Sequence, residues 1–376
     1  MTERVAVVGV GVLGACVGWN LARRGARVVL VDAAERPGAG VTNWSFSWVN
    51  ASNKTVTRAY FDLNVAGMAA HRELAAAVGP GSWWHPGGHL RWADDPATEA
   101  EFLNTGELLA SWGYGVEVCT GAEARRRLEP AVALPDDASV LHYPDEAWVH
   151  GRRLVRRLVD EAVAGGAELR TGAAVRTIDT GTGGGGGGPH TVTLSDGSRL
   201  DADAVVNAAG PDASHVAGLV GRRLPMRREP GAVSRIDCGG PVPVHRAMHT
   251  PHIEVRPDGD TSMVLHSREV DALIDSDTGP ASPEEFGRLL HASARHVVPA
   301  LSAAHPVETR VVNRPVPADG FPSVGAVPSV PGYYEAVTHS GITLGPVLGR
   351  LLAEEILTGR RAELLADYRP ERFPVT

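Results

Sequence analysis

Three glycines near the start of the chain have the spacing that binds the phosphates of a dinucleotide. An apolar segment runs directly into Gly9-x-Gly11-x-x-Gly14. In such a turn Gly9 permits the tight bend, Gly11 lets the backbone approach a pyrophosphate, and Gly14 lets the next helix pack closely on the strand. The positive N-terminal end of that helix, expected over residues 15–24, faces the phosphates. The spacing therefore predicts a dinucleotide site.

Asp32 adds an acidic group to the same site. It closes the next expected strand, residues 27–31, eighteen residues after Gly14. An acidic residue in this place accepts hydrogen bonds from ribose hydroxyls. Because the strand, helix, second strand and carboxylate all fall in register, an accidental glycine match is disfavoured.

Lys54 is the only lysine among 36 basic residues. GC-rich codon usage explains the excess of arginine, and on that interpretation Lys54 has no special role. The alternative is a functional role, because an ammonium is a compact charge whose pKa moves on burial, whereas a guanidinium stays charged. The sequence leaves both interpretations open.

The elements that position these residues follow from local patterns. A loop over residues 36–54 carries Trp44, Phe46 and Trp48, which are either a ligand wall or core filler. Expected helices cover 59–78, 96–112, 151–164, 283–298 and 344–357, and expected strands include 89–93, 167–178, 191–194, 203–207 and 333–337. The glycine run over 181–188 is interpreted as the tip of a hairpin.

Composition excludes several classes of function. The chain has 376 residues and a net charge of −8, which gives no basic face for nucleic acid. The opening apolar run is too short, and too rich in glycine, for a signal or membrane-spanning segment, so a cytoplasmic protein is expected. Cys16, Cys119 and Cys238 have neither disulfide nor metal-ligand spacing, and no metal site is expected.

Four stretches of the chain carry a resemblance to a known family. They are the Gly9 to Gly14 turn with Asp32, residues 205–210 (Val-Val-Asn-Ala-Ala-Gly), residues 314–325 (Arg-Pro-Val-Pro-Ala-Asp-Gly-Phe-Pro-Ser-Val-Gly) and residues 339–346 (His-Ser-Gly-Ile-Thr-Leu-Gly-Pro). Together they resemble the D-amino-acid oxidase (DAO) superfamily of FAD-dependent oxidoreductases, in the branch of glycine oxidase and monomeric sarcosine oxidase.

The resemblance implies an α/β fold of two domains. A Rossmann-like FAD-binding domain of the glutathione-reductase type is expected from residues 1–85, 145–222 and 312–376. A smaller, mostly antiparallel α+β substrate domain is expected from residues 86–144 and 223–311.

FAD is favoured over NAD(P) as the dinucleotide. A nicotinamide enzyme needs a second mononucleotide half directly after the first, whereas here the second strand, 203–207, returns about 170 residues later. The cofactor-binding residues that the resemblance implies are Gly9, Gly11, Val12, Leu13, Gly14, Asp32, Ala33, Val175, Ala209, Gly210, Ser340, Gly341, Ile342, Thr343 and Leu344.

Non-covalent FAD is expected from two departures. Relatives that bind flavin covalently use a cysteine near what is Val312 here, or a histidine in the loop that here reads Thr42-Asn43-Trp44. Sarcosine is disfavoured as substrate because Thr343 stands where sarcosine oxidases carry a lysine.

The resemblance also assigns candidate catalytic residues. Arg314 occupies the place of a carboxylate-binding arginine, although a structural ion pair is the alternative. His339 is either a polar substrate contact or a local hydrogen-bonding group. Lys54 would lie against the flavin and favour its reaction with O2. Glu254, on a strand before Arg256, is a further candidate for the substrate face.

The expected activity is oxidation of the C–N bond of an amine or amino acid, with hydride transfer to flavin N5, hydrolysis of the imine, and reoxidation by O2 to give H2O2. The alternatives are a dehydrogenase that passes electrons to a quinone or protein partner, an NAD(P)-dependent dehydrogenase, and a non-catalytic flavoprotein subunit. The identity of the amine, its stereochemistry and the oligomeric state stay open.

Overall fold

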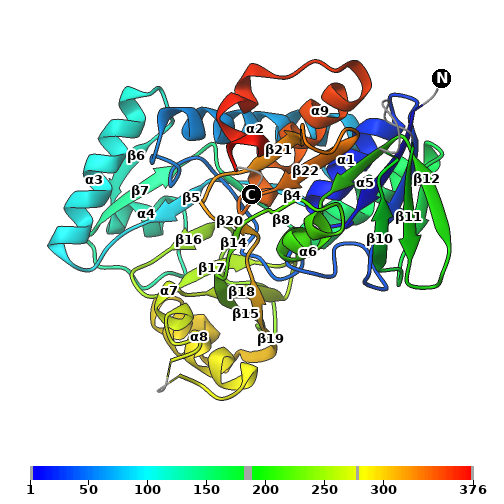
Figure 1. The fold of residues 1–376 in the computed structure, drawn as a ribbon. Helices are drawn as coiled ribbons and strands as arrows, with labels where there is room; N and C mark the ends of the chain where they lie inside the picture. The colour runs from blue at the N-terminus through cyan, green and yellow to red at the C-terminus, as the bar shows by residue number, and fades with distance from the viewer. Residues whose placement is uncertain (1–2, 182–188, 277–278, 374–376) are drawn as a thin grey trace.

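A six-stranded sheet forms the centre of one half of the molecule (Figure 1). The computed structural model describes residues 3–181, 189–276 and 279–373. The sheet order is β21-β22-β13-β1-β2-β9, with β1 Arg4–Val8, β2 Arg27–Val31, β9 Glu168–Arg170, β13 Ala204–Asn207, β21 Ser323–Ala326 and β22 Tyr333–Val337. All neighbours are parallel except β21 and β22. Strands from the beginning, middle and end of the chain therefore meet in one sheet.

The apolar character of β1 follows from burial on both faces. Val5 and Val7 face one hydrophobic cluster, whereas Ala6 and Val8 face another, as the two-residue repeat of a strand requires. The first cluster contains α1 Val12–Ala22, α2 Arg58–Val78, α5 Gly151–Ala164 and α9 Gly341–Thr358, and the second contains the antiparallel sheet β10 Val175–Asp179, β11 His190–Leu194 and β12 Arg199–Ala202.

Helices α1 and α9 pack in direct contact. A Cβ at Gly349 would lie 2.7 Å from the Cβ of Cys16, and one at Gly345 would lie 3.2 Å from the Sγ of Cys16. Small residues at both places let the two helices approach closely.

An eight-stranded sheet occupies the other half of the molecule (Figure 1). Its order is β19-β15-β18-β17-β16-β5-β7-β6, with β5 His89–Arg91, β6 Glu117–Thr120, β7 Ser139–Tyr143, β15 Pro230–Asp237, β16 Ala247–His249, β17 Glu254–Pro257, β18 Ser262–His266 and β19 His305–Asn313. Only the β16–β5 pair is parallel. The helix α8 Pro283–Val297 buries Phe286, Leu290 and Ala294 in the same hydrophobic cluster as β15 and β18.

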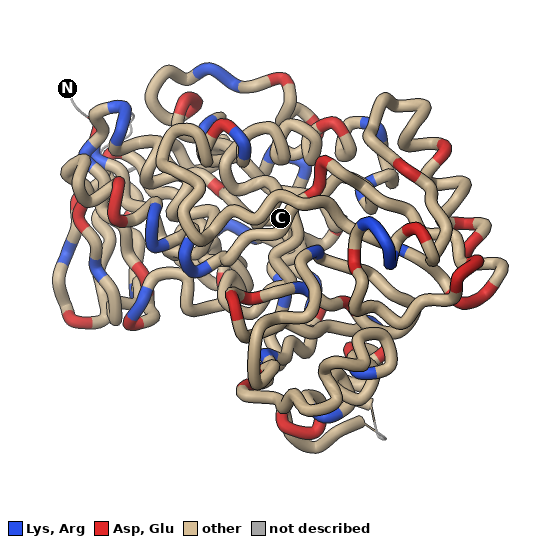
Figure 2. Tube along the Cα trace, turned by 180° about the vertical axis from the view of Figure 1, so that it is seen from behind, with Lys and Arg blue, Asp and Glu red and all other residues tan. Residues whose placement is uncertain are grey.

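Shorter elements complete the fold. They are β3 Trp48–Val49, β4 Trp84–Pro86, β8 Ala147–Val149, β14 Met226–Arg227, β20 Val316–Pro317, α3 Pro96–Ser111, α4 Gly121–Arg127, α6 Ala213–Gly218, α7 Arg268–Asp271 and 3-10 turns at 210–212, 299–303, 363–368 and 370–372. Charged residues of both signs are interspersed along the chain (Figure 2). None of the described helices is both long and apolar enough to cross a membrane.

The expected α/β class with a parallel, Rossmann-like sheet is confirmed, and several boundaries differ from expectation. Helix α1 begins at Val12 rather than at residue 15, because Gly11 is already its N-cap. The expected strand 167–178 divides into β9 and β10 at Gly172, whose φ is 65°. The expected hairpin tip at 181–188 lies outside the described residues, apart from Gly181.

Candidate active site

The glycine turn after β1 has the shape that its spacing predicts. Gly9 has a φ of 93°, and a Cβ there would lie 2.5 Å from the carbonyl oxygen of Ala208. A Cβ at Gly14 would lie 1.8 Å from the carbonyl oxygen of Gly9. The carboxylate of Asp32 accepts hydrogen bonds from the backbone N–H groups of Val10 at 2.7 Å and Ala34 at 2.8 Å. Asp32 thus stabilises the turn through these hydrogen bonds, and it also lines a cavity next to the turn.

A cavity of about 610 Å³ extends from this turn to the start of α9. Most of the sequence-predicted cofactor residues line it: Gly9, Gly11, Val12, Leu13, Asp32, Ala33, Val175, Ala209, Gly210, Gly341 and Ile342. Gly14 lies beneath the turn, against Gly9. Leu344 is part of the buried core, and its N–H donates to the carbonyl of Ser340. Neither its side chain nor its N–H is directed into the cavity.

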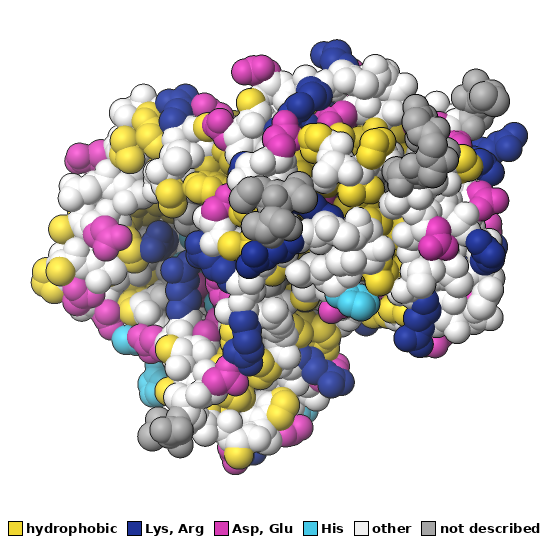
Figure 3. Space-filling view, in the orientation of Figure 1, with side chains coloured by type: hydrophobic (Ala, Val, Ile, Leu, Met, Phe, Trp, Pro, Cys, Tyr) yellow, Lys and Arg dark blue, Asp and Glu magenta, His cyan; other side chains and the backbone are white. Residues whose placement is uncertain are grey.

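A second cavity of about 510 Å³ adjoins the first. The two share the wall residues Val41, Ser45, Pro315, His339 and Ile342. The second cavity contains Lys54, Arg314 and His339, the three residues that the sequence nominates for catalysis, together with Ser340 and Thr343. Figure 3 shows Lys and Arg side chains around a recess on this face of the molecule.

A family model described as FAD dependent oxidoreductase, DAO, matches residues 4–355. The chain belongs to the DAO family. The uncharacterized oxidoreductase YurR of Bacillus subtilis (strain 168) is 28% identical over 383 residues, which are 97% of each chain. The bifunctional protein MnmC of Thiobacillus denitrificans, named for tRNA 5-methylaminomethyl-2-thiouridine biosynthesis, is 28% identical over 388 residues, and this chain spans 59% of its length.

Glycine oxidase from Geobacillus kaustophilus is 25% identical over 382 residues, 98% of this chain and 97% of that protein. A crystal structure of glycine oxidase from the same organism has a TM-score of 0.84 and 24% identity, and it covers 99% of this chain and 100% of that chain. The protein is therefore an FAD-dependent oxidoreductase, as the four motifs indicate, and FAD rather than NAD(P) is its dinucleotide.

The donors around the first cavity suit FAD. The N-cap residues of α1 and α9 make no capping side-chain hydrogen bond, and the N-terminal turns of both helices line the cavity. At α1 the N–H of Val12 donates to Thr42 Oγ1 at 3.0 Å, and the next N–H groups of that turn have no such acceptor in the part of the chain that the structure describes. An uncapped helix start presents N–H groups and a positive dipole end, which suit a pyrophosphate at α1 and the oxygen-rich pyrimidine edge of a flavin at α9. The side chain of Thr343 instead holds the neighbouring backbone, because its Oγ1 donates to the carbonyl of Trp48 at 3.2 Å.

Replacing Gly14 with Ala should prevent FAD retention. The added Cβ meets the backbone of Gly9, so we expect a loss of about 3 kcal/mol or more in the free energy of unfolding. Thermal unfolding and the ratio of flavin to protein absorbance measure both effects. Gly218→Ala is the matched control, since a Cβ at Gly218 meets nothing within 4 Å, and we expect no loss of FAD from it. Normal FAD content in Gly14→Ala would contradict the packing role.

Arg314 forms the ion pair that the sequence left as an alternative. Its guanidinium binds the carboxylate of Asp271, lies 2.7 Å from His266 Nε2, and donates to the carbonyl of Pro230 at 3.4 Å. A Cβ at Gly231 would collide with this guanidinium at 2.3 Å, so the glycine makes room for it. Arg314 still contacts the second cavity, with part of its guanidinium committed to Asp271.

Two other cations line the second cavity with no carboxylate partner. In the described part of the chain, no ion pair forms at Lys54 or at Arg268, an exposed residue that sequence reasoning missed. Burial and the charge of Arg268 lower the pKa of Lys54 to about 8. The side chain of His339 is exposed to the space inside the cavity. The surrounding protein atoms nevertheless desolvate its ring, and this desolvation and the charge of Lys54 lower its pKa well below the usual range. Glu229, Glu254 and Asp271 line the same cavity, so Lys54 and Arg268 are its cations outside the ion pairs of the described residues.

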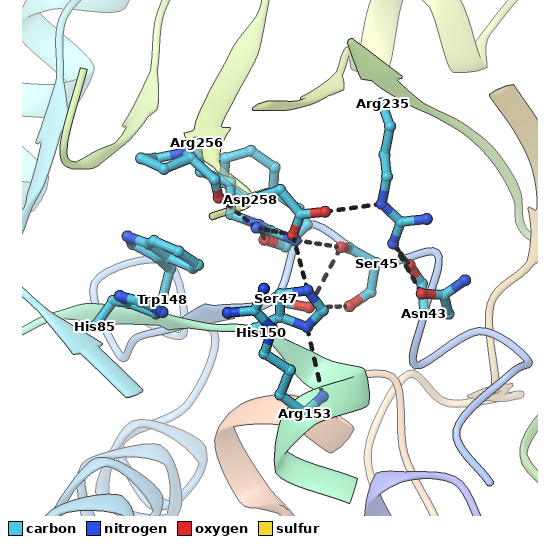
Figure 4. Close-up of polar contacts among 12 residues, drawn as sticks. Asn43, Ser45, Ser47, His85, Trp148, His150, Arg153, Arg235, Arg256 and Asp258 are labelled. Carbon is cyan, nitrogen blue, oxygen red and sulfur yellow. Dashed lines mark hydrogen bonds and ion pairs between the residues drawn. The ribbon is translucent and has the colours of Figure 1, made fainter. Parts of the chain in front are cut away.

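The loop between the two cavities is fixed by buried arginines (Figure 4). Arg256 donates to the carbonyl of Phe46 and to Asp258 Oδ1 at 2.9 Å. Arg235 donates to Asp258 Oδ2 at 2.8 Å and to the carbonyl of Asn43 at 2.6 Å. The chain around Asn43 and Phe46 is thereby tied to β15 and β17. Trp44, Phe46 and Trp48 all line the second cavity, so they form its wall as well as filling the core.

Proposed function

We propose that this protein oxidises the C–N bond of a small amino acid and that O2 reoxidises its flavin. The single observation that carries the proposal is the second cavity, which adjoins the cofactor cavity at His339 and presents Lys54, Arg268 and Arg314. Bound FAD supplies the hydride acceptor and the reaction with O2. The protein's own part is to hold a carboxylate, orient the amine and exclude water.

The basic residues of the second cavity have different roles in this proposal. Arg268 is free of ion pairs in the described residues, so its charge is available to a substrate carboxylate. Lys54, which also forms no ion pair there, favours the reaction of the reduced flavin with O2. Asp271 and His266 hold the guanidinium of Arg314 in place, so only the part of it that they leave uncovered contributes to carboxylate binding. His339, at the boundary of the two cavities, is neutral and provides a polar contact beside the reacting carbon.

Anaerobic mixing of the FAD-loaded protein with D-, L- and N-methyl amino acids tests the proposal. Loss of flavin absorbance with one class, followed by fast recovery in air, is the expected result. Bleaching with slow recovery would show a dehydrogenase that needs another electron acceptor. No bleaching by any amino acid would contradict amine oxidation as proposed here.

The FAD should dissociate when the protein is denatured. Val312 and the Thr42-Asn43-Trp44 segment offer no cysteine or histidine for a covalent bond, and Asn43 is occupied by Arg235. We expect acid precipitation to leave a white pellet and FAD in the supernatant, measured by fluorescence. A yellow pellet would show a covalent link.

A further inference from the structure

A row of four titratable side chains, two half-buried and two fully buried, leads away from the second cavity. Glu254 and His249 line the cavity, and Glu254 Oε1 lies 3.3 Å from His249 Nε2. His249 Nδ1 lies 2.7 Å from His89 Nε2. His89 Nδ1 lies 3.4 Å from Glu146 Oε2. The row thus joins β17, β16 and β5 to the turn before β8. None of its four residues lines the first cavity, where the flavin is expected.

The inner end of the row is enclosed. His89 and Glu146 have no exposed side-chain surface. Trp48 packs against both histidines in a tilted arrangement, with ring centres 4.3 Å from His89 and 4.2 Å from His249. Its Nε1 donates to Glu146 Oε2 at 2.7 Å, and Tyr114 Oη donates to Glu146 Oε1 at 2.7 Å. A carboxylate at this depth is costly unless it is hydrogen-bonded, and these donors offset the cost for Glu146.

A count of the N–H protons in the row shows that it can accept one further proton. Each of its three contacts needs one proton between the two facing atoms, and two neutral imidazoles bring only two. When Glu254 and Glu146 are both ionised, one of the three contacts therefore has no proton between its two facing atoms. His89 Nδ1 has no hydrogen-bond partner in the structure, so its 3.4 Å contact with Glu146 Oε2 must shorten for the last transfer. A proton that enters at Glu254 or His249 can move inward by shifts along the three contacts until it rests on Glu146.

We propose that Glu254, His249 and His89 carry the ammonium proton of the substrate to Glu146, so that the bound amine becomes neutral before it is oxidised. This rests on the proposed function. The step is balanced: one N–H bond of the ammonium breaks, one O–H bond forms on Glu146, and no electron moves.

The charges along the row set its direction. Burial raises the pKa of Glu146 to about 7, against the hydrogen bonds from Tyr114 and Ser52. Burial lowers the pKa of His249 to about 4 and that of His89 as well, so both are neutral carriers. Although burial opposes it, His249 and His266 hold the pKa of Glu254 below its usual range.

Other titratable groups surround the row. His266 lies between Glu254 Oε2 at 2.7 Å and Asp271 Oδ2 at 2.8 Å, which raise its pKa to about 9 against burial. The groups that face Glu146 besides His89 are Tyr114, Tyr143 and Lys54, and those that face the histidines are Arg91, His142 and Arg268.

The sign of the pH dependence follows. Glu146 accepts a proton only when ionised, so flavin reduction should rise with pH through about 7 in the unmodified protein. Glu146→Gln keeps the side-chain shape but takes up no proton, and His89→Asn keeps a donor and an acceptor but transmits none. In both variants the inflection should move up to the pKa of the free substrate ammonium. Near pH 8 reduction should slow by about 100-fold.

Anaerobic stopped-flow reduction, with the amino acid that bleaches the flavin, compares the two variants, their double mutant and His291→Asn. His291 is a partly buried histidine of α8, bound to the carbonyl of Leu301 and outside the row, so this control should keep the unmodified profile. We expect the double mutant to match each single variant, because both interrupt one row. An unmoved inflection in Glu146→Gln or His89→Asn would overturn the relay, as would additive losses.

A readout without substrate separates the two proposals. Infrared titration of the FAD-loaded protein should show a carboxylic acid that ionises near pH 7 and is missing from Glu146→Gln. If no amino acid bleaches the flavin, the proposed function fails while this band still appears. If the flavin bleaches and no such band exists, the relay fails alone.

Discussion

Lys54→Met should slow the reaction of the reduced flavin with O2 by about 100-fold, with a much smaller effect on flavin reduction by the substrate. One positive charge a few ångströms from a developing negative charge contributes about 2–3 kcal/mol at the effective dielectric of a protein site. Lys54 lines the cavity beside His339 and forms no ion pair within the described chain. Stopped-flow mixing of the reduced protein with O2 measures the oxidative step, and anaerobic reduction measures the other.

The pH dependence of that step supplies a second check. Because burial lowers the pKa of Lys54 to about 8, its charge is present below this pH and is lost above it. Oxidation of the reduced flavin should therefore slow as the pH rises through about 8, and this decline should be missing from Lys54→Met. Lys54→Arg is the control that keeps the charge. Equal slowing of both half-reactions in Lys54→Met would argue against a role in O2 reactivity.

Arg268→Met should raise the amino acid concentration that half-saturates flavin reduction by about 10- to 150-fold. A hydrogen bond to a charged group contributes about 1.5–3 kcal/mol, and Arg268 is an exposed guanidinium of the cavity without an ion pair in the described structure. Anaerobic titration at several substrate concentrations gives the saturation constant and the limiting rate separately. The limiting rate should change little.

Arg314→Met should behave differently. It leaves Asp271 without its guanidinium partner but still bound to His266, so we expect a loss of about 1–3 kcal/mol in the free energy of unfolding together with weaker substrate binding. Arg288→Met, an exposed position of α8, is the control for loss of an arginine. If Arg314→Met weakened binding without loss of stability and Arg268→Met did not weaken it, the carboxylate would be assigned to Arg314 alone.

Local patterns predicted the cofactor half of the molecule well. The expected bounds of β2 and β22, 27–31 and 333–337, match the structure, because short runs of mainly β-branched, aromatic and other apolar residues between turn residues are typical of central strands. The Gly9 to Gly14 turn is also a local feature. The start of α9 was expected too late, at residue 344, since no capping side chain marks Ser340 and Gly341 as a helix start. The division into two domains at residues 86, 145, 223 and 312 stays a prediction.

The substrate half depends on contacts that no local pattern encodes. Arg268 follows a short strand with no motif around it, and its importance comes from facing Lys54 across a cavity. His89, Glu146 and His249 lie on separate segments that only the β5–β16 pairing and the turn after β7 bring together. Single histidines are ordinary in any sequence, so nothing in their spacing indicated the row.

The assembly of the first cavity has a consequence for biosynthesis. Its phosphate end is built from residues 9–13, but its other end requires β22 and the start of α9. Since β1 is joined to β22 only through β13, a nascent chain that has emerged as far as residue 210 holds the glycine turn without the opposite wall. A chain synthesised only as far as residue 210 therefore cannot contact FAD along its whole length. The complete FAD site forms only once the segment that contains β22 and the start of α9 has been synthesised.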